Sequence, residues 1–219
     1  MRESKSLTVL LAALTALVLL TGSISVPILC RPFYYAHITP LGLCEETGLT
    51  EGQIRSAFNE MLDYCLGGTE FSTGVLRWSE RGRSHFADVR ALFRVNLWGL
   101  GISAVLLLTT LAAARWRGWK PAPLLGRGAG FWAGAGLGGA FLLMGGLAAP
   151  DFDRAFAIFH TLFFPGKDNW LFDPCTDEII RILPQAYFMH CAILIFTLLG
   201  FGCAALIAAD LFPARRRKG

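Results

Sequence analysis

The sequence predicts an all-α membrane protein with four transmembrane helices and a small extracellular cap. The chain has 219 residues, of which 54% are hydrophobic and 16% are charged, whereas a soluble globular domain has about 25% charged residues. Four apolar runs are each long enough to cross a bilayer, because about 20 residues of helix span its hydrocarbon core. The basic residues gather in short segments beside these runs, as they do in membrane proteins.

The four predicted spans cover approximately residues 7–29, 95–114, 130–149 and 187–211. Helices of this length fill most of the chain, so we expect residues 1–219 to form a single membrane domain. The first run is longer than the hydrophobic region of a signal peptide, which has about 7 to 15 residues, and we expect it to be retained. The third span has Gly130, Gly134 and Gly138 at a four-residue spacing that favours close helix packing.

Basic residues without acidic neighbours predict the orientation. The basic residues Arg115, Arg117, Lys120 and Arg127 follow the second span, and four more occupy positions 215–218 after the fourth span. The positive-inside rule places both segments, and both termini, in the cytoplasm. Residues 30–94 and 150–186 would then form the extracellular cap. The basic balance of the chain is explained by this topology, so we expect no nucleic-acid partner.

The first outer segment contains a predicted amphipathic helix in the stretch "TEGQIRSAFNEMLDYCLGG". Thr50 and Gln53 form a capping box at its start, and Gly67 and Gly68 end it. Its apolar stripe consists of Ile54, Ala57, Phe58, Met61 and Leu62.

The end of the same segment, "RWSERGRSHFADVRALFR", predicts a helix that continues into the second span. We expect Ser84 to cap this helix. His85 then lies in its first turn, and Asp88 lies one turn later on the same face. Arg90 follows at the level of lipid headgroups.

The second outer segment predicts a short helix over Asp151 to Phe164, a turn at "PGKDNW" and a second short helix within "DPCTDEIIRILP". Pro174 suits the first turn of that second helix, Asp177 favours its positive N-terminus, and Pro184 ends it. Aromatic residues concentrate along the whole segment.

Topology brings His85 and His160 to the same outer surface. Histidine can exchange a proton near neutral pH, so the pair could perform acid-base chemistry. Asp88, Asp173 and Asp177 are available to fix the tautomers of the two rings. His37 and His190 are weaker candidates, because cap packing and a contact between helices explain them.

No other chemistry is indicated. The chain has neither the G-x-S-x-G pattern of a nucleophilic serine nor the histidine spacing of a zinc site, so we expect no metal and no cofactor. Four cysteines, Cys30, Cys44, Cys65 and Cys175, fall on the outer side. These cysteines could form disulfide bonds or remain as buried free thiols, and the sequence does not decide between the two.

Two motifs resemble one family. The stretches "SERGRSHFADVR" and "FHTLFFPGKDNWLFDPCTDEIIRILPQAYF" resemble the two signatures of the lipoprotein intramolecular transacylases, an integral membrane protein family formerly of unknown function. The four-span layout of that family, with its extracellular cap, covers the whole chain.

The resemblance implies an acyltransferase of the bacterial cell membrane with an extracellular active site. Such enzymes move the sn-2 acyl chain of a diacylglyceryl-cysteine lipoprotein to the amino group of its N-terminal cysteine, which gives the lyso-form lipoprotein. The family's two catalytic histidines correspond to His85 and His160. The partners would be the lipoprotein in the outer leaflet and membrane lipid, and the enzyme would be a monomer.

Five further residues would hold the substrate or orient the histidines. Asp88, Asp173 and Asp177 are candidates for fixing the histidines or binding the amine, and Arg90 and Trp170 for shaping the site. Two alternatives remain open. One is a membrane acyl or phospholipid hydrolase that uses the same histidines, and the other is a non-catalytic protein that binds lipid or lipoprotein.

Overall fold

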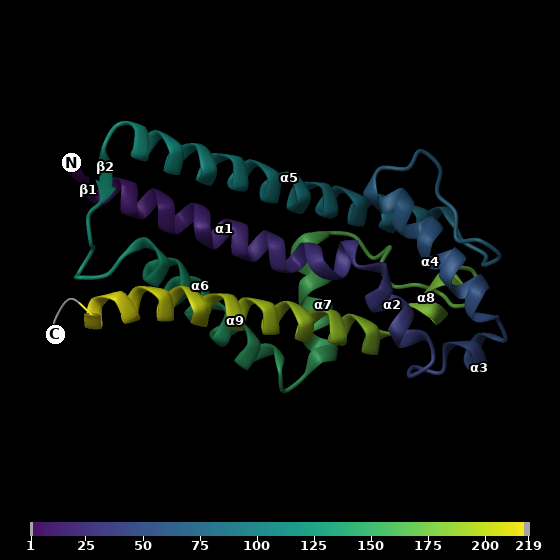
Figure 1. Ribbon diagram of the computed structural model, residues 1–219. Helices are drawn as coiled ribbons and strands as arrows, with labels where there is room; N and C mark the ends of the chain where they lie inside the picture. The colour runs from purple at the N-terminus through teal and green to yellow at the C-terminus, as the bar shows by residue number, and fades with distance from the viewer. Residues whose placement is uncertain (1, 217–219) are drawn as a thin grey trace. The chain divides into compact units, whose positions relative to one another are not determined.

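The computed structural model describes residues 2–216, apart from the side chains of residues 148 and 213–216. The chain divides into two compact units. Unit 1 consists of the residues up to Ser25, of Asn96–Leu147 and of those from Leu194 onward, and unit 2 consists of Val26–Val95 and Ala148–Ile193. Figure 1 labels the helices and strands of both.

Within the described residues, four helices are long and apolar enough to cross a membrane: α1 (Lys5–Leu29), α5 (Glu80–Trp116), α6 (Ala129–Ala148) and α9 (Gln185–Arg216). They confirm the four predicted spans. The helix α5 begins before the predicted span at residue 95 and continues into it, as the sequence predicts. Its first turns carry many charged residues, so its apolar part starts only after Arg94.

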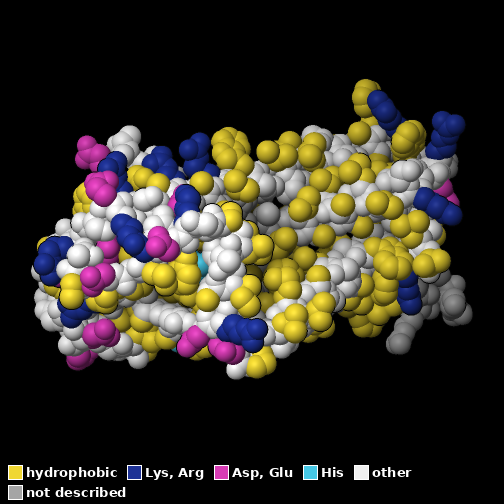
Figure 2. Space-filling view, turned by 180° about the vertical axis from the view of Figure 1, so that it is seen from behind, with side chains coloured by type: hydrophobic (Ala, Val, Ile, Leu, Met, Phe, Trp, Pro, Cys, Tyr) yellow, Lys and Arg dark blue, Asp and Glu magenta, His cyan; other side chains and the backbone are white. Residues whose placement is uncertain are grey.

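The packing of α6 against α9 in unit 1 depends on glycine. A Cβ atom on Gly134 would lie 2.7 Å from the carbonyl oxygen of Cys203, and one on Gly138 would lie 3.4 Å from Cys203 Cβ. The predicted packing role of these glycines is therefore confirmed. The other faces of these helices expose large apolar side chains, and Figure 2 shows such side chains over much of the visible face of unit 1.

Unit 1 also contains a short parallel pair of strands that the sequence did not predict. Strand β1 (Arg2–Ser4) pairs with β2 (Trp119–Pro121), with Glu3 opposite Lys120. The hydroxyl of Thr8 donates to the carbonyl oxygen of Ala122 at 2.5 Å. These bonds hold the beginning of α1 beside the loop that follows α5.

Among the described residues, unit 2 contains five shorter helices: α2 (Arg31–Ile38), α3 (Leu43–Thr47), α4 (Glu51–Leu66), α7 (Phe152–Phe163) and α8 (Ile179–Ile182). All of them except α7 contribute to one hydrophobic core. Tyr34 lies at the centre, with its ring stacked on Phe58 at 3.7 Å and its hydroxyl donating to the carbonyl oxygen of Ile182 at 2.8 Å. A buried polar group needs such a partner, so this bond also fixes how α8 sits against α2 and α4.

The helix α4 matches its prediction closely. Thr50 and Gln53 form the reciprocal capping box, Gly67 ends the helix, and the whole predicted apolar stripe is buried. The helix α7 also forms as predicted, because the side chain of Asp151 accepts from the amide of Arg154 at its start.

Ser84 does not cap α5, so that prediction is wrong. The hydroxyl of Ser79 accepts from the amide of Gly82 at 3.0 Å, and the helix begins at Glu80. The reason is a contact that is distant in sequence. The carboxylate of Asp177 accepts from the amide and the hydroxyl of Ser79 at 2.8 and 2.9 Å, and holds Ser79 at the helix start.

The second short helix begins later than predicted. It starts at Ile179 instead of near Pro174, although it does end before Pro184, as expected. Asp173 and the residues after it form a turn, in which the Asp173 carboxylate accepts from the amide of Cys175 at 2.8 Å. Side-chain bonds of this kind compete with helix formation.

All six cysteines lie in the described part of the chain, and none of them is paired. Cys30 and Cys175 are exposed, whereas Cys65 is buried in the core of unit 2. Burial raises the pKa of Cys65 to about 12, so its thiol stays protonated at neutral pH.

Candidate functional site

The structure brings His85 and His160 together within unit 2, as predicted. His85 lies near the beginning of α5 and His160 near the end of α7. Their ring centroids are 5.7 Å apart, and the two residues are only 5% and 6% exposed. Two imidazoles at this separation can act on one small group between or beside them.

Aromatic rings surround the pair. Phe164 and Phe172 lie 5.1 and 5.4 Å from the ring of His85, and Phe156 lies 4.3 Å from that of His160. Trp170 stacks on His160 at 4.5 Å, with 27° between the ring planes. This environment keeps water away and disfavours a charged imidazolium, so both rings are expected to be neutral.

A single hydrogen bond fixes the tautomer of His160. Its Nδ1 lies 2.8 Å from the carbonyl oxygen of Phe156, one turn earlier in α7. A carbonyl oxygen only accepts, so Nδ1 carries the proton and Nε2 has the free lone pair. Burial lowers the pKa of His160 below its ordinary value, although the bond to Phe156 opposes part of that change. His160 is therefore a neutral base at pH 7.

His85 differs from His160 in having an unpaired nitrogen. Its Nδ1 is buried and has no hydrogen-bond partner among the described residues. The amide oxygen of Asn169 is likewise buried and has no hydrogen bond of normal geometry. Burial lowers the pKa of His85 to about 4, and the Asn169 side chain, which lies close to the ring, opposes part of that change. Leaving a buried polar atom unpaired costs about 1–3 kcal/mol, so a ligand that paired with these two atoms would be stabilised by the contact.

An ionic network lies one helical turn from His85. Asp88 Oδ1 accepts from Lys167 Nζ at 2.5 Å, and Asp88 Oδ2 accepts from Asn169 Nδ2 at 3.0 Å. Lys167 and Asn169 belong to the turn that follows α7. The sequence singled out Asp88 but not these two partners, although they lie in the predicted turn "PGKDNW", a polar stretch within an aromatic segment.

Asp177 and Asp173 do not contact either histidine of the pair through a hydrogen bond. Asp177 is buried at the start of α5, where a Cβ atom on Gly82 would lie 2.1 Å from its Oδ1. Asp173 is exposed and stabilises the turn before α8. Both carboxylates therefore hold backbone in place.

Arg90 also serves a different part of unit 2. Its guanidinium donates to the carbonyl oxygen of Gly68 at 2.7 Å and lies over the ring of Tyr64 at 5.0 Å. These contacts tie α5 to the end of α4. Of the five residues expected beside the histidines, the structure brings Trp170 and Asp88 to the site.

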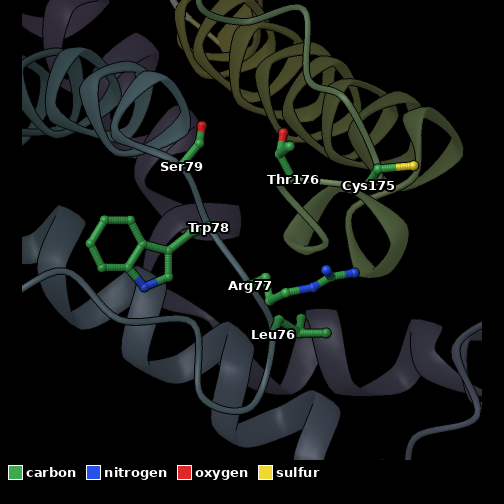
Figure 3. Close-up of a pocket in the computed structure, with 6 residues that line it drawn as sticks. All are labelled: Leu76, Arg77, Trp78, Ser79, Cys175 and Thr176. Carbon is green, nitrogen blue, oxygen red and sulfur yellow. The ribbon is translucent and has the colours of Figure 1, made fainter.

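A surface groove lies elsewhere in unit 2, with a volume of about 510 Å³. Figure 3 shows that the indole of Trp78 and the guanidinium of Arg77 point in different directions from one segment, with Cys175 on the facing loop. Arg77 is paired with Glu178 at 2.7 Å. No histidine lines this groove, and among the described residues no three metal-binding side chains come together.

Comparison with family profiles identifies one family. A family profile described as "Lipoprotein intramolecular transacylase Lit" matches residues 9–188. A search of curated proteins found no match.

Solved structures share the fold. The membrane integral lipoprotein intramolecular transacylase Lit from Bacillus cereus is 20% identical, with a TM-score of 0.84 over 97% of this chain and 96% of that chain. Two structures of variants of that protein, with a histidine replaced by alanine or by arginine, are each 18% identical, with TM-scores of 0.78. They cover 97% of this chain and 94% and 92% of those chains.

Proposed function

The chain belongs to the lipoprotein intramolecular transacylase family, and we propose that it moves the sn-2 acyl chain of a diacylglyceryl-cysteine lipoprotein to the amino group of the same cysteine. It is an acyltransferase and a multi-pass membrane protein. The observation that carries the proposal is the buried pair of His85 and His160 inside an aromatic shell.

The reaction needs only proton transfer and positioning. The amine nitrogen forms a bond to the ester carbonyl carbon, the bond from that carbon to the glycerol oxygen breaks, and one proton passes from nitrogen to oxygen. An α-amino group has a pKa of about 7.7–8.0, so a neutral histidine can take its proton. The free Nε2 of His160 suits this step, and the second ring can serve the leaving oxygen.

The aromatic shell favours the amine over water as the nucleophile. Water in the site would hydrolyse the ester, and the rings around the two histidines keep it out. Because amine and ester belong to one molecule, the enzyme mainly has to hold them together, and positioning of this kind supplies about 7–11 kcal/mol of the barrier.

The positive-inside rule supports a cytoplasmic position for the basic loop and the helix ends of unit 1, and an extracellular site is proposed on that rule. The pairing of β1 with β2 holds the beginning of the chain beside the loop after α5, and the carboxylate of Asp210 on α9 accepts from the amide of Gly128 at 2.8 Å. The beginning of α1, the basic loop and the end of α9 are thus tied to one another. The positive-inside rule then places them in the cytoplasm. The basic tail at 215–218 falls largely outside the described residues and side chains.

Mass spectrometry of a reporter lipoprotein tests the proposal. Cells that make this protein should convert the reporter from the diacylglyceryl form to the N-acylated lyso form, at unchanged total mass. Release of free fatty acid without N-acylation would indicate a hydrolase instead. An unchanged reporter, with the protein present in the membrane, would indicate a binding protein.

A further inference from the structure

Asp88 and Asn169 form a set of hydrogen-bond acceptors beside the two histidines. The carboxylate of Asp88 is 21% exposed, and Asn169 is 9% exposed. The amide nitrogen of Asn169 must face the carboxylate, because only the nitrogen can donate to it. The amide oxygen of Asn169 is therefore left as an unpaired acceptor.

An ammonium group already occupies part of this set. The ammonium of Lys167 lies 2.5 Å from Asp88 Oδ1. An ammonium has three N–H donors, but the only side-chain acceptor that Lys167 reaches in the described structure is this carboxylate. The buried oxygen of Asn169 stays unpaired, although the Lys167 ammonium binds Asp88, the carboxylate that accepts from the Asn169 nitrogen. The acceptor set is thus larger than Lys167 fills.

We propose that Asp88 and Asn169 bind the α-ammonium group of the substrate's N-terminal cysteine, and that Lys167 holds this place until the substrate displaces it. This proposal rests on the proposed function and names the amine-binding part of the same site. A substrate ammonium can pair with Asp88 and with the free oxygen of Asn169, which leaves one N–H for a histidine. His85 lies one turn from Asp88 and its ring is 5.7 Å from that of His160, so the amine is held beside the histidine pair that handles its proton.

The lysine can be displaced at small cost. Its side chain is 48% exposed, and an ion pair with an exposed partner adds little to stability. When it leaves Asp88, its ammonium returns to solvent. A substrate whose amine is already acylated carries no ammonium and would leave Lys167 in place, so the site would also distinguish substrate from product.

Binding measurements that need no turnover can test the proposal. The protein is placed in lipid nanodiscs and titrated with a labelled dialkylglyceryl-cysteine peptide, whose ether links cannot transfer an acyl chain. Its N-acetylated counterpart serves as the probe without an ammonium. The variants are Lys167→Met, Lys167→Arg and Asp88→Asn. Arg83→Gln is the matched control, because Arg83 pairs with Glu80 on the same helix and is not bound to Asp88.

The free-amine probe should bind the unmodified protein about tenfold or more tightly than the N-acetylated probe, as expected for a charge-assisted hydrogen bond. Lys167→Met should improve binding of the free-amine probe by about two- to fivefold and leave the N-acetylated probe unchanged. Lys167→Arg and Arg83→Gln should behave like the unmodified protein. Asp88→Asn should remove the preference for the free amine.

The outcomes separate this proposal from the function on which it rests. Weaker or unchanged binding of the free-amine probe to Lys167→Met would show that Lys167 does not occupy the ammonium site. This measurement does not depend on whether Asp88→Asn folds. Failure of both probes to bind the unmodified protein would overturn the proposed substrate and this inference with it.

Discussion

Unit 2 contains two pairs of histidines that are built in the same way. The rings of His85 and His160 are 5.7 Å apart, and those of His37 and His190 are 5.0 Å apart. In each pair one ring bonds through Nδ1 to a carbonyl oxygen one turn earlier, Phe156 for His160 and Phe33 for His37. In each pair the other ring has a buried, unpaired Nδ1.

The pairs differ in what lies beside them. The first is about nine-tenths buried or more, and an ionic network begins one turn away at Asp88. The second is only partly buried, and the rings that contact it are Phe33 and Tyr187. No ion pair of the described residues includes His37 or His190. The two pairs therefore differ in whether a charged network lies beside them, and variants of both pairs can show whether that difference decides activity.

The largest expected effect separates the two pairs directly. His85→Gln and His160→Gln should each lower the rate of acyl transfer by about 10²–10⁴-fold, which is the range for general acid-base catalysis. The measurement is conversion of a diacylglyceryl peptide by the purified protein, with thermal unfolding as the control for folding. An activity loss of less than about tenfold in either variant would remove that histidine from the chemistry.

The polar network is expected to give the next largest effect. Asn169→Leu keeps the size of the side chain but removes the donor to Asp88 and the unpaired oxygen, so the ratio kcat/KM should fall by about tenfold. Asn59→Leu is the matched control, since Asn59 accepts a hydrogen bond from Tyr35 elsewhere in unit 2 at 2.7 Å. Equal losses in both variants would show that the effect is structural.

The protonation of His160 offers a third comparison. Burial lowers its pKa, so the ring should remain neutral as the pH falls below about 6.5, the ordinary value for histidine. Trp170→Ala uncovers the ring, and the pKa should rise toward that value. NMR titration of labelled histidine, assigned with His160→Gln, measures both. A midpoint above 6.5 in the unmodified protein would contradict the role of burial.

The lowered pKa of His160 also makes the stability of the protein depend on pH. A histidine whose pKa is lowered by folding stabilises the protein above its ordinary pKa, and this contribution is lost as the pH falls toward the folded value. Unfolding measured between about pH 7 and 5 should therefore show less dependence on pH in His160→Gln than in the unmodified protein.

The smallest effect is expected at the second pair. His37→Gln and His190→Gln should change the transfer rate by less than about threefold, because neither ring lies beside the ionic network. These variants are assayed on the same peptide as those of His85 and His160. A loss of a hundredfold in either would make the second pair part of the site.

Local patterns in the sequence predicted much of the fold. The four spans, the capping box of α4 and the glycines of α6 depend on residues that are close together in the chain, and they were found where expected. The sequence predicts Ser84 as a cap because it precedes the periodic pattern. The contact between Asp177 and Ser79 instead stabilises a helix start at Glu80. No local pattern reports a bond between two segments so far apart.

The candidate site also combines features that the sequence predicts with features that only the structure shows. The sequence by itself determined that His85 and Asp88 share a face of one helix, that His160 follows the third span, and which family signatures surround them. Only the tertiary structure decided that the two rings lie 5.7 Å apart, that Lys167 and Asn169 bind Asp88, and that Arg90 and Asp177 serve other contacts. Periodicity fixes which side chains share a face, whereas the packing of distant segments fixes which of them touch.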